Sequence, residues 1–180
     1  MDDRAQGAGL GAPDEVDEGP AGAVAEGLER VISFWLRGQL FALPIAQVRE
    51  TLAMGKRAVT RVFQTPDFVL GIVNLRGTIL AVLDLGRYLG LGRATLGETS
   101  RVLVAEGAVQ RRTAGLLVDA VAPWRAVDPA GLAPAPPTLR GERAACVRGV
   151  VTLEGGRPLA LLDLDAVIGA PELKQFQRKG

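Results

Sequence analysis

The sequence contains an internal repeat, and this repeat constrains the fold more than any other feature. Residues 71–77 align with residues 149–155, and residues 78–90 align with residues 157–169, with one additional glycine in the second copy. Ten of these twenty aligned positions are identical, including the Leu-Asp-Leu sequence at 83–85 and 162–164. Because the order of motifs is the same in both halves, we predict two similar half-domains that repeat with a period of about 75 residues.

A weaker similarity extends the repeat upstream. Residues 41–48 align with residues 114–121, and two of these positions are identical: Leu43 matches Leu116, and Val48 matches Val121. The pattern of apolar residues persists between the identities. We therefore treat Val48 and Val121 as equivalent positions of the two halves.

From residue 30 onward, short apolar runs alternate with glycine and other turn residues. Residues 31–36 and 40–43 predict two strands joined by the turn Arg37-Gly38-Gln39, and residues 71–73 and 78–83 predict a second hairpin. Short strands with regular turns are typical of all-β folds, so we predict that each half is a sheet that closes into a small barrel.

Short helical turns are expected after some of these strands. Pro44 can begin one, because proline suits the first position of a helix, and Ile45 and Val48 would share its buried side. Asp84 can cap another turn at residues 85–89.

The charge is divided unevenly along the chain. The net charge is +1, but residues 1–29 hold eight acidic residues and one arginine, whereas residues 30–180 carry a balance of +8. We predict that residues 1–29 are a disordered acidic tail, because they contain almost no large apolar side chains. The folded domain is expected at 30–170, with a first barrel at about 30–95 and a second at about 96–170, some exchange of strands being possible.

Two further segments have distinct compositions. Residues 123–137 contain five prolines, which predict an irregular surface loop that braces the two halves. Residues 171–180 are expected to be a frayed C-terminal tail.

The composition excludes several classes of enzyme. The chain has no histidine and a single cysteine, Cys146, so imidazole-based catalysis, histidine-ligated zinc and an internal disulfide are impossible. Cys146 lies between apolar residues and is interpreted as a small core residue. No dinucleotide or phosphate-loop motif is present. We therefore expect no enzymatic activity, no cofactor and no metal.

Paired carboxylates offer the remaining route to catalysis. Asp84 and Asp163 could share acid and base roles, but each occupies the same place in its own repeat, where an aspartate caps the following helical turn. Asp119 and Asp165 are isolated in apolar surroundings. The capping interpretation is favoured over an active site.

Nucleic-acid binding is the alternative function, because small barrels with a basic body can bind single strands. Such surfaces stack bases on exposed aromatic residues, yet this chain has only eight aromatics. The only adjacent arginines are Arg111 and Arg112, at a predicted hairpin tip.

No apolar run is long enough to span a membrane, and the acidic start does not resemble a signal peptide, so a soluble cytoplasmic protein is expected.

Arg76 requires a separate explanation. It lies in the tight connection between two predicted strands, flanked by Leu75 and Gly77, where its side chain should be exposed. The second repeat has Glu154 at the equivalent position, so the turn itself does not require arginine. If Arg76 has a role, the second repeat lacks it, which would indicate that Arg76 binds a partner.

These residues resemble a known family. The run from Val62 to Leu85 is similar to the central signature of the CheW-like family of chemotaxis coupling proteins. Residues 115–121 resemble the start of that family's second subdomain, residues 132–137 its proline-containing loop and residues 149–164 its closing strands. The resemblance covers residues 30–170. Ala81, Gly86 and Phe63-Gln64 depart from the common pattern without breaking it.

The resemblance implies two five-stranded β-barrel subdomains around a shared apolar core. It implies a non-catalytic adaptor that couples chemoreceptor signalling tips to the regulatory domain of a CheA-type histidine kinase, at membrane-bound receptor arrays. The absence of histidine from this chain would then be expected, because the histidine that is phosphorylated belongs to the kinase. Transferred by motif, the partner-binding residues would be Asn74, Arg76, Val48, Glu50 and Val121.

Overall fold

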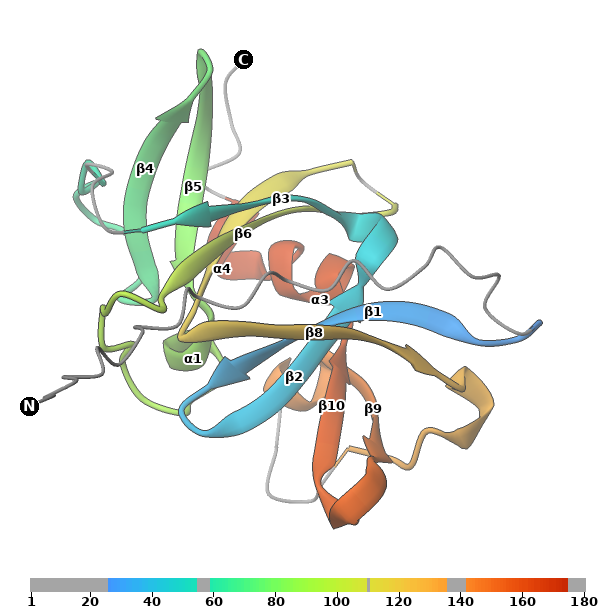
Figure 1. The fold of residues 1–180 in the computed structure, drawn as a ribbon. Helices are drawn as coiled ribbons and strands as arrows, with labels where there is room; N and C mark the ends of the chain where they lie inside the picture. Colours follow the sequence, from blue (N-terminus) through green and yellow to red (C-terminus); the bar gives the residue numbers. More distant parts are fainter. Residues whose placement is uncertain (1–25, 55–58, 110, 136–141, 175–180) are drawn as a thin grey trace, which may run out of the picture.

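The structure is a computed structural model that describes residues 26–54, 59–109, 111–135 and 142–174. Ten strands and several short helices make up this part of the chain (Figure 1). The strands are β1 (Glu29–Leu36), β2 (Gln39–Pro44), β3 (Val48–Ala53), β4 (Val69–Leu75), β5 (Thr78–Asp84), β6 (Arg101–Glu106), β7 (Thr113–Val118), β8 (Ala120–Val127), β9 (Val147–Thr152) and β10 (Pro158–Leu162). The α-helices are α1 (Leu85–Tyr88), α2 (Glu142–Ala145), α3 (Leu164–Ile168) and α4 (Pro171–Lys174), and 3₁₀ turns span Ile45–Gln47, Pro129–Gly131 and Glu154–Gly156.

The strands form two five-stranded sheets, which confirms the predicted all-β fold. Sheet A has the order β8-β1-β2-β10-β9, and sheet B has the order β3-β6-β7-β5-β4. All neighbours are antiparallel except β2 with β10 and β7 with β5. The two orders are equivalent, because each sheet places a β-hairpin between a single strand and a second hairpin that leads into a helix. The repeat seen in the sequence is therefore a repeat of structure.

The sheets do not follow the contiguous division at residue 95. Sheet A combines β1 and β2 from the first repeat with β8, β9 and β10 from the second, and sheet B combines the remaining strands. The exchange of strands between the halves is thus reciprocal. Sequence similarity identified the segments that are alike but could not identify the segments that pair, because pairing is decided by how the shared core is buried.

Neither sheet closes into a complete barrel, so the prediction of closure was wrong. In sheet B the edge strand β4 is joined by an isolated bridge to the segment that follows β3, and in this bridge Thr60 and Ile72 exchange two backbone hydrogen bonds of 2.9 Å. In sheet A the equivalent bridge joins Ala133 to Val150, at 2.9 and 2.8 Å. We call the gap between the edge strands of each sheet its seam.

Glycine makes these bridges possible. A Cβ atom at Gly71 would lie 2.2 Å from the carbonyl oxygen of Thr60, and one at Gly149 would lie 2.8 Å from that of Ala133. Gly71 also has a φ of +144°, which other residues rarely adopt. The two glycines are aligned in the repeat, so this identity has a steric cause.

Three clusters of buried apolar side chains stabilise the fold. The largest is shared by both sheets and includes Phe34 and Phe41 of sheet A with Leu103 and Leu116 of sheet B. Helix α3 contributes to it and lies between the strands of the two sheets in Figure 1. The other two clusters lie within sheet B and within sheet A. The shared core predicted from the family resemblance is present.

Both predicted caps are confirmed. The side chain of Asp84 accepts a hydrogen bond from the backbone N–H of Arg87 at 3.0 Å, and that of Asp163 accepts one from Ala166 at 3.0 Å. Cys146 is buried, as expected.

Several local predictions were wrong. Ile45 is 40% exposed instead of buried, because its helical turn is only three residues long and the chain is already extended at Val48. Residues 120–127 form a strand despite Pro123, which β8 tolerates because it is an edge strand.

The ordered structure extends into both predicted tails. Strand β1 begins at Glu29, which forms an ion pair with Arg148, and residues 171–174 form α4, whose Leu173 is buried. The rest of the predicted acidic tail, residues 1–25, lies outside the described residues, as do Pro136, Pro137 and residues 175–180.

Candidate functional site

Arg76 lies at the tip of the β4–β5 hairpin, which projects from the rest of the molecule in Figure 1. Its φ of +52° and that of Gly77, +88°, form a tight turn with two left-handed residues. The side-chain oxygen of Asn74 accepts a hydrogen bond of 2.8 Å from the N–H of Gly77. Asn74 therefore shapes the turn that presents Arg76, and its own oxygen is engaged within the hairpin.

In the equivalent turn of the second repeat, only glycines adopt the left-handed backbone conformation. Between β9 and β10, the residues with positive φ are Gly155, at +80°, and Gly156, at +78°. Glycine adopts such angles without strain, whereas other residues pay about 1 kcal/mol or more. Arg37 and Arg111, at the other hairpin turns, have similar φ values of +50° and +52°, so what distinguishes Arg76 is the contact that its side chain makes.

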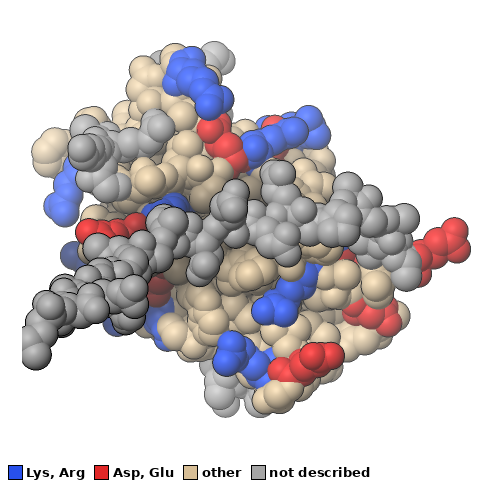
Figure 2. Space-filling view, viewed as in Figure 1, with Lys and Arg blue, Asp and Glu red and all other residues tan. Residues whose placement is uncertain are grey.

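The guanidinium of Arg76 takes part in an exposed ion pair. Its two terminal nitrogens lie 3.1 and 3.4 Å from the two carboxylate oxygens of Glu50 on β3. Since β3 and β4 are the two edges of sheet B, this contact spans the seam. The side chain of Arg76 is nevertheless 79% exposed, against 26% for that of Glu50. Figure 2 shows acidic and basic side chains together over this part of the molecule.

The two valines lie at equivalent places in different sheets. Val48 begins β3 opposite Ala105, and Val121 lies on β8 opposite Phe34. Both are partly buried against the shared core. The structure thus brings Glu50 and Arg76 into contact and places Val48 on the same strand as Glu50, whereas Val121 belongs to the other sheet.

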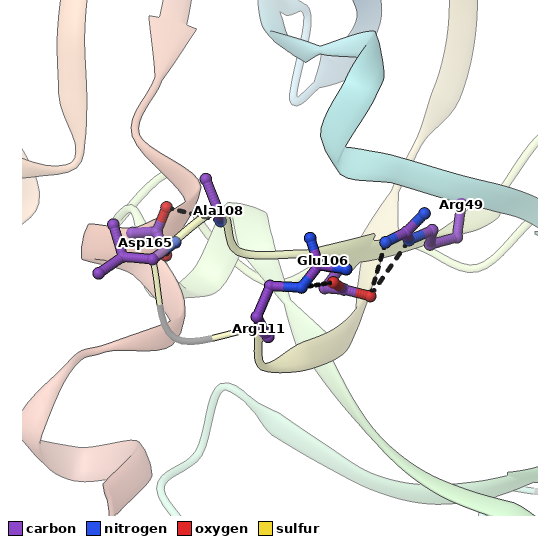
Figure 3. A network of polar contacts seen from close by, with 6 residues as sticks. Arg49, Glu106, Ala108, Arg111 and Asp165 are labelled. Carbon is purple, nitrogen blue, oxygen red and sulfur yellow. Dashed lines mark hydrogen bonds and ion pairs between the residues drawn. The ribbon is translucent and has the colours of Figure 1, made fainter.

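A second charged network continues along β3 (Figure 3). The carboxylate of Glu106, at the end of β6, lies 3.0 Å from Arg49 and 2.7 Å from Arg111. Its hydrogen bond with Arg49, together with the charge of Arg111, holds the pKa of Glu106 below its usual value. The sequence does not indicate this network, because its three residues lie in separate parts of the chain and show no common motif.

Helix α3 contacts the turn between β6 and β7. The carboxylate of Asp165 accepts hydrogen bonds from the backbone N–H groups of Ala108, at 2.9 Å, and Val109, at 3.1 Å (Figure 3). The prediction that Asp165 is isolated was therefore wrong, as it was for Asp119, which accepts a 2.6 Å hydrogen bond from the N–H of Arg37. Both contacts join a hairpin turn to a distant segment, which local sequence does not indicate.

An apolar groove borders the Arg76 hairpin. It has a volume of about 330 Å³ and is lined by β4, β5, β7, α3 and α4, without a charged residue. Ile79, which pairs with Asn74 in the hairpin, lines this groove and is 62% exposed. We call it the β5 groove. The site therefore combines an exposed guanidinium with an apolar surface beside it.

Within the described residues, no group of three His, Cys, Asp or Glu side chains could hold a metal ion. None of the helices described is long and apolar enough to cross a membrane.

Comparison with known proteins decides the family. The family model of the CheW-like domain matches residues 30–172. The chain belongs to the CheW-like family. It is 33% identical to the chemotaxis protein CheW of Rhizobium meliloti over 149 residues, which cover 83% of this chain and 93% of that protein. It is 35% identical to the protein FrzA of Myxococcus xanthus over 116 residues, covering 64% and 69% of the two chains.

A solved structure agrees with this assignment. The scaffolding protein TtCheW from Thermoanaerobacter tengcongensis superimposes with a TM-score of 0.69 at 28% identity, covering 81% of this chain and 95% of that one. The similar proteins include chemotaxis proteins and this scaffolding protein, and the chain is accordingly a chemotaxis coupling adaptor. No comparison favours the alternative of single-stranded nucleic-acid binding.

Proposed function

We propose that this adaptor couples chemoreceptor signalling tips to the regulatory domain of a CheA-type histidine kinase, and that the surface around Arg76 makes one of these two contacts. The observation that carries the proposal is the left-handed, exposed arginine at the β4–β5 turn. The aligned turn of the second repeat is one residue longer and has Glu154 at the position of Arg76, so the repeat does not require an arginine there.

The ion pair with Glu50 prepares Arg76 for binding. A guanidinium has five N–H donors in a planar arrangement, and Glu50 occupies only part of them. The remaining donors face solvent and can bind a carboxylate or a backbone carbonyl of a partner. Because the pairing already limits the motion of a long side chain, less conformational entropy is lost when the partner binds.

The apolar part of the contact is supplied by neighbouring residues. Val48 lies on the same strand as Glu50, and Ile79 leads from the hairpin into the β5 groove. Interfaces between proteins typically have a few anchoring contacts in an apolar centre with charged residues around it. We infer that Arg76 and Glu50 direct the orientation of the partner and that Val48 contributes apolar contact area.

Signal transfer would not require catalysis by this chain. A rigid body that binds two partners at once can shift the equilibrium of one partner when the other rearranges. Val121, the counterpart of Val48 in sheet A, lies on a separate surface that could serve the second contact. In this proposal the protein is non-enzymatic and is recruited to membrane-bound receptor arrays through its partners.

The test compares equivalent turns of the two repeats. Arg76→Glu and Glu154→Arg each reverse one exposed charge, and both proteins are assayed by pull-down with a receptor signalling tip and with the kinase regulatory domain. We expect Arg76→Glu to lose at least one of these interactions, whereas Glu154→Arg should retain both. Undiminished binding of folded Arg76→Glu to both partners would refute the assignment.

A further inference from the structure

The molecule has a second groove that is equivalent to the β5 groove by the internal repeat. It is lined by strands β2, β9 and β10, the end of β1 and the residues at the end of α1, and its volume is about 600 Å³. Val150, Pro158 and Ala160 line it at the positions that Ile72, Ile79 and Ala81 occupy in the β5 groove. We call it the β10 groove.

The two grooves differ in charge. The lining of the β5 groove has no charged side chain, whereas the β10 groove has two arginines, Arg143 and Arg157, and no carboxylate. Arg157 lies over the ring of Trp35, with 5.4 Å between its guanidinium carbon and the ring centroid. The β10 groove therefore combines an aromatic and aliphatic floor with positive charge at its wall.

These two arginines retain their charge for a ligand. None of the ion pairs between described residues involves Arg143 or Arg157. The nearby carboxylate of Asp67 pairs with Arg87, whose hydrogen bond is the main cause of the lowered pKa of Asp67, and the charge of Arg143 adds to this effect without forming an ion pair. The chemistry of the groove therefore fits a segment with carboxylates on either side of an apolar residue.

The chain itself contains such a segment. Residues 14–18 read Asp-Glu-Val-Asp-Glu, so four carboxylates flank Val16. Ten residues lie between Glu18 and Glu29, the first residue of β1, and the eleven steps from one glutamate to the other can span up to about 36 Å. Trp35 lies six residues along the strand from Glu29, or roughly 20 Å. The tether is thus long enough to reach the groove.

We propose that residues 14–18 of the N-terminal segment dock in the β10 groove of the same molecule, with their carboxylates facing Arg143 and Arg157. Val16 then contacts the apolar floor. Because the segment is tethered, its effective concentration is of the order of millimolar, so a weak contact is sufficient for substantial occupancy. The groove that the repeat created twice would be open in sheet B and occupied by the chain's own segment in sheet A.

The test measures the accessibility of Trp35 in the full chain. Trp124→Phe leaves Trp35 as the only tryptophan, and acrylamide, an uncharged quencher, reports its exposure through fluorescence. In this background, the segment is neutralised by Asp14→Asn, Glu15→Gln, Asp17→Asn and Glu18→Gln. We expect the neutralised segment to increase the quenching constant by about twofold at low salt and high salt to remove the difference, since exposed charges are then screened.

Further variants separate the groove from general charge effects. Arg143→Gln, which leaves Arg157 over the ring of Trp35, should raise quenching in the same way, whereas Arg61→Gln, which removes an exposed arginine elsewhere, should leave it unchanged. The protection of Trp35 should also survive about a hundredfold dilution, because the contact is intramolecular. Equal quenching with the natural and the neutralised segment would overturn the proposal, and protection that disappears on dilution would assign the groove to a second copy instead.

Discussion

The β4–β5 turn and the β9–β10 turn occupy equivalent places in the two repeats, but the second is longer by one glycine and forms a 3₁₀ turn. The second turn places glycines at its left-handed positions, whereas the first places Arg76 there and pairs it with Glu50 across the seam. Where the repeats agree, as at Gly71 and Gly149, a steric requirement of the fold explains the identity. The comparison teaches that the two repeats share the steric requirements of the fold at these glycines and differ at the turn, where only the first copy presents an ion pair on the surface.

The largest effect should come from the glycines at the two seams. Gly71→Ala should lower the free energy of unfolding by about 3 kcal/mol or more, because the new Cβ clashes with the backbone of Thr60 and φ is positive. Gly149→Ala should cost less, about 1–2 kcal/mol, because its clash is milder and no unusual φ is required. Urea unfolding of both variants measures the difference. Equal losses would show that the two seams are not distinguished by backbone conformation.

The two capping aspartates should differ by a smaller amount. Asp84 is fully buried and also accepts a 2.8 Å hydrogen bond from the N–H of Ala94, whereas Asp163 is partly exposed and makes only the cap among the described residues. We expect Asp84→Ala to cost about 2–3 kcal/mol and Asp163→Ala about 1 kcal/mol. Thermal unfolding of the pair checks the order, and a larger loss for Asp163→Ala would contradict it.

Replacing Arg76 by glycine should separate stability from binding. Arg76→Gly removes an exposed ion pair of little energetic value and relieves the left-handed strain, so the protein should be as stable as wild type or more stable by up to about 1 kcal/mol. Binding to the partner should nevertheless be lost. Chemical denaturation and the pull-down assay are performed on the same preparation, and a destabilised variant would show that Arg76 serves the fold.

The smallest expected effect concerns acid. The pKa of Glu106 is lowered in the folded protein by Arg49 and Arg111, so its contribution to stability is present above the usual value of 4.5 and is lost as the pH falls through the lowered value. Glu106→Gln should therefore make stability less dependent on pH below about 4.5 without changing that dependence near neutrality. Unfolding midpoints recorded across this range would contradict the assignment if the two proteins had parallel pH profiles.

Sequence reasoning succeeded where the information was local. Hairpins, caps and the exposed Arg76 follow from neighbouring residues, and the repeat reports the equivalence of the two halves. It left open which strands the repeats exchange, because pairing of β1 with β8 and of β3 with β6 depends on how the two sheets bury their shared core.

The charged contacts of the site could not be predicted from local sequence patterns, because they join residues that are far apart in the chain. The Glu50–Arg76 pair joins residues 26 apart, and Asp165 contacts a hairpin tip 57 residues away. The family resemblance supplied Glu50, Arg76 and Val48 as partner-binding residues, but only the fold shows that the first two touch. Arg49 and Glu106 had no signal in the sequence.

A charge swap tests the central claim most directly. Glu50→Arg with Arg76→Glu restores an ion pair across the seam but reverses the charge that the turn presents to a partner. Titration calorimetry with the receptor signalling tip and with the kinase regulatory domain compares the swap with wild type. Our account predicts a stable protein that binds one of these partners at least about tenfold weaker, which corresponds to about 1.4 kcal/mol. Full affinity of the swapped protein for both partners would contradict it, because the pair would then serve only to join the two edges of sheet B.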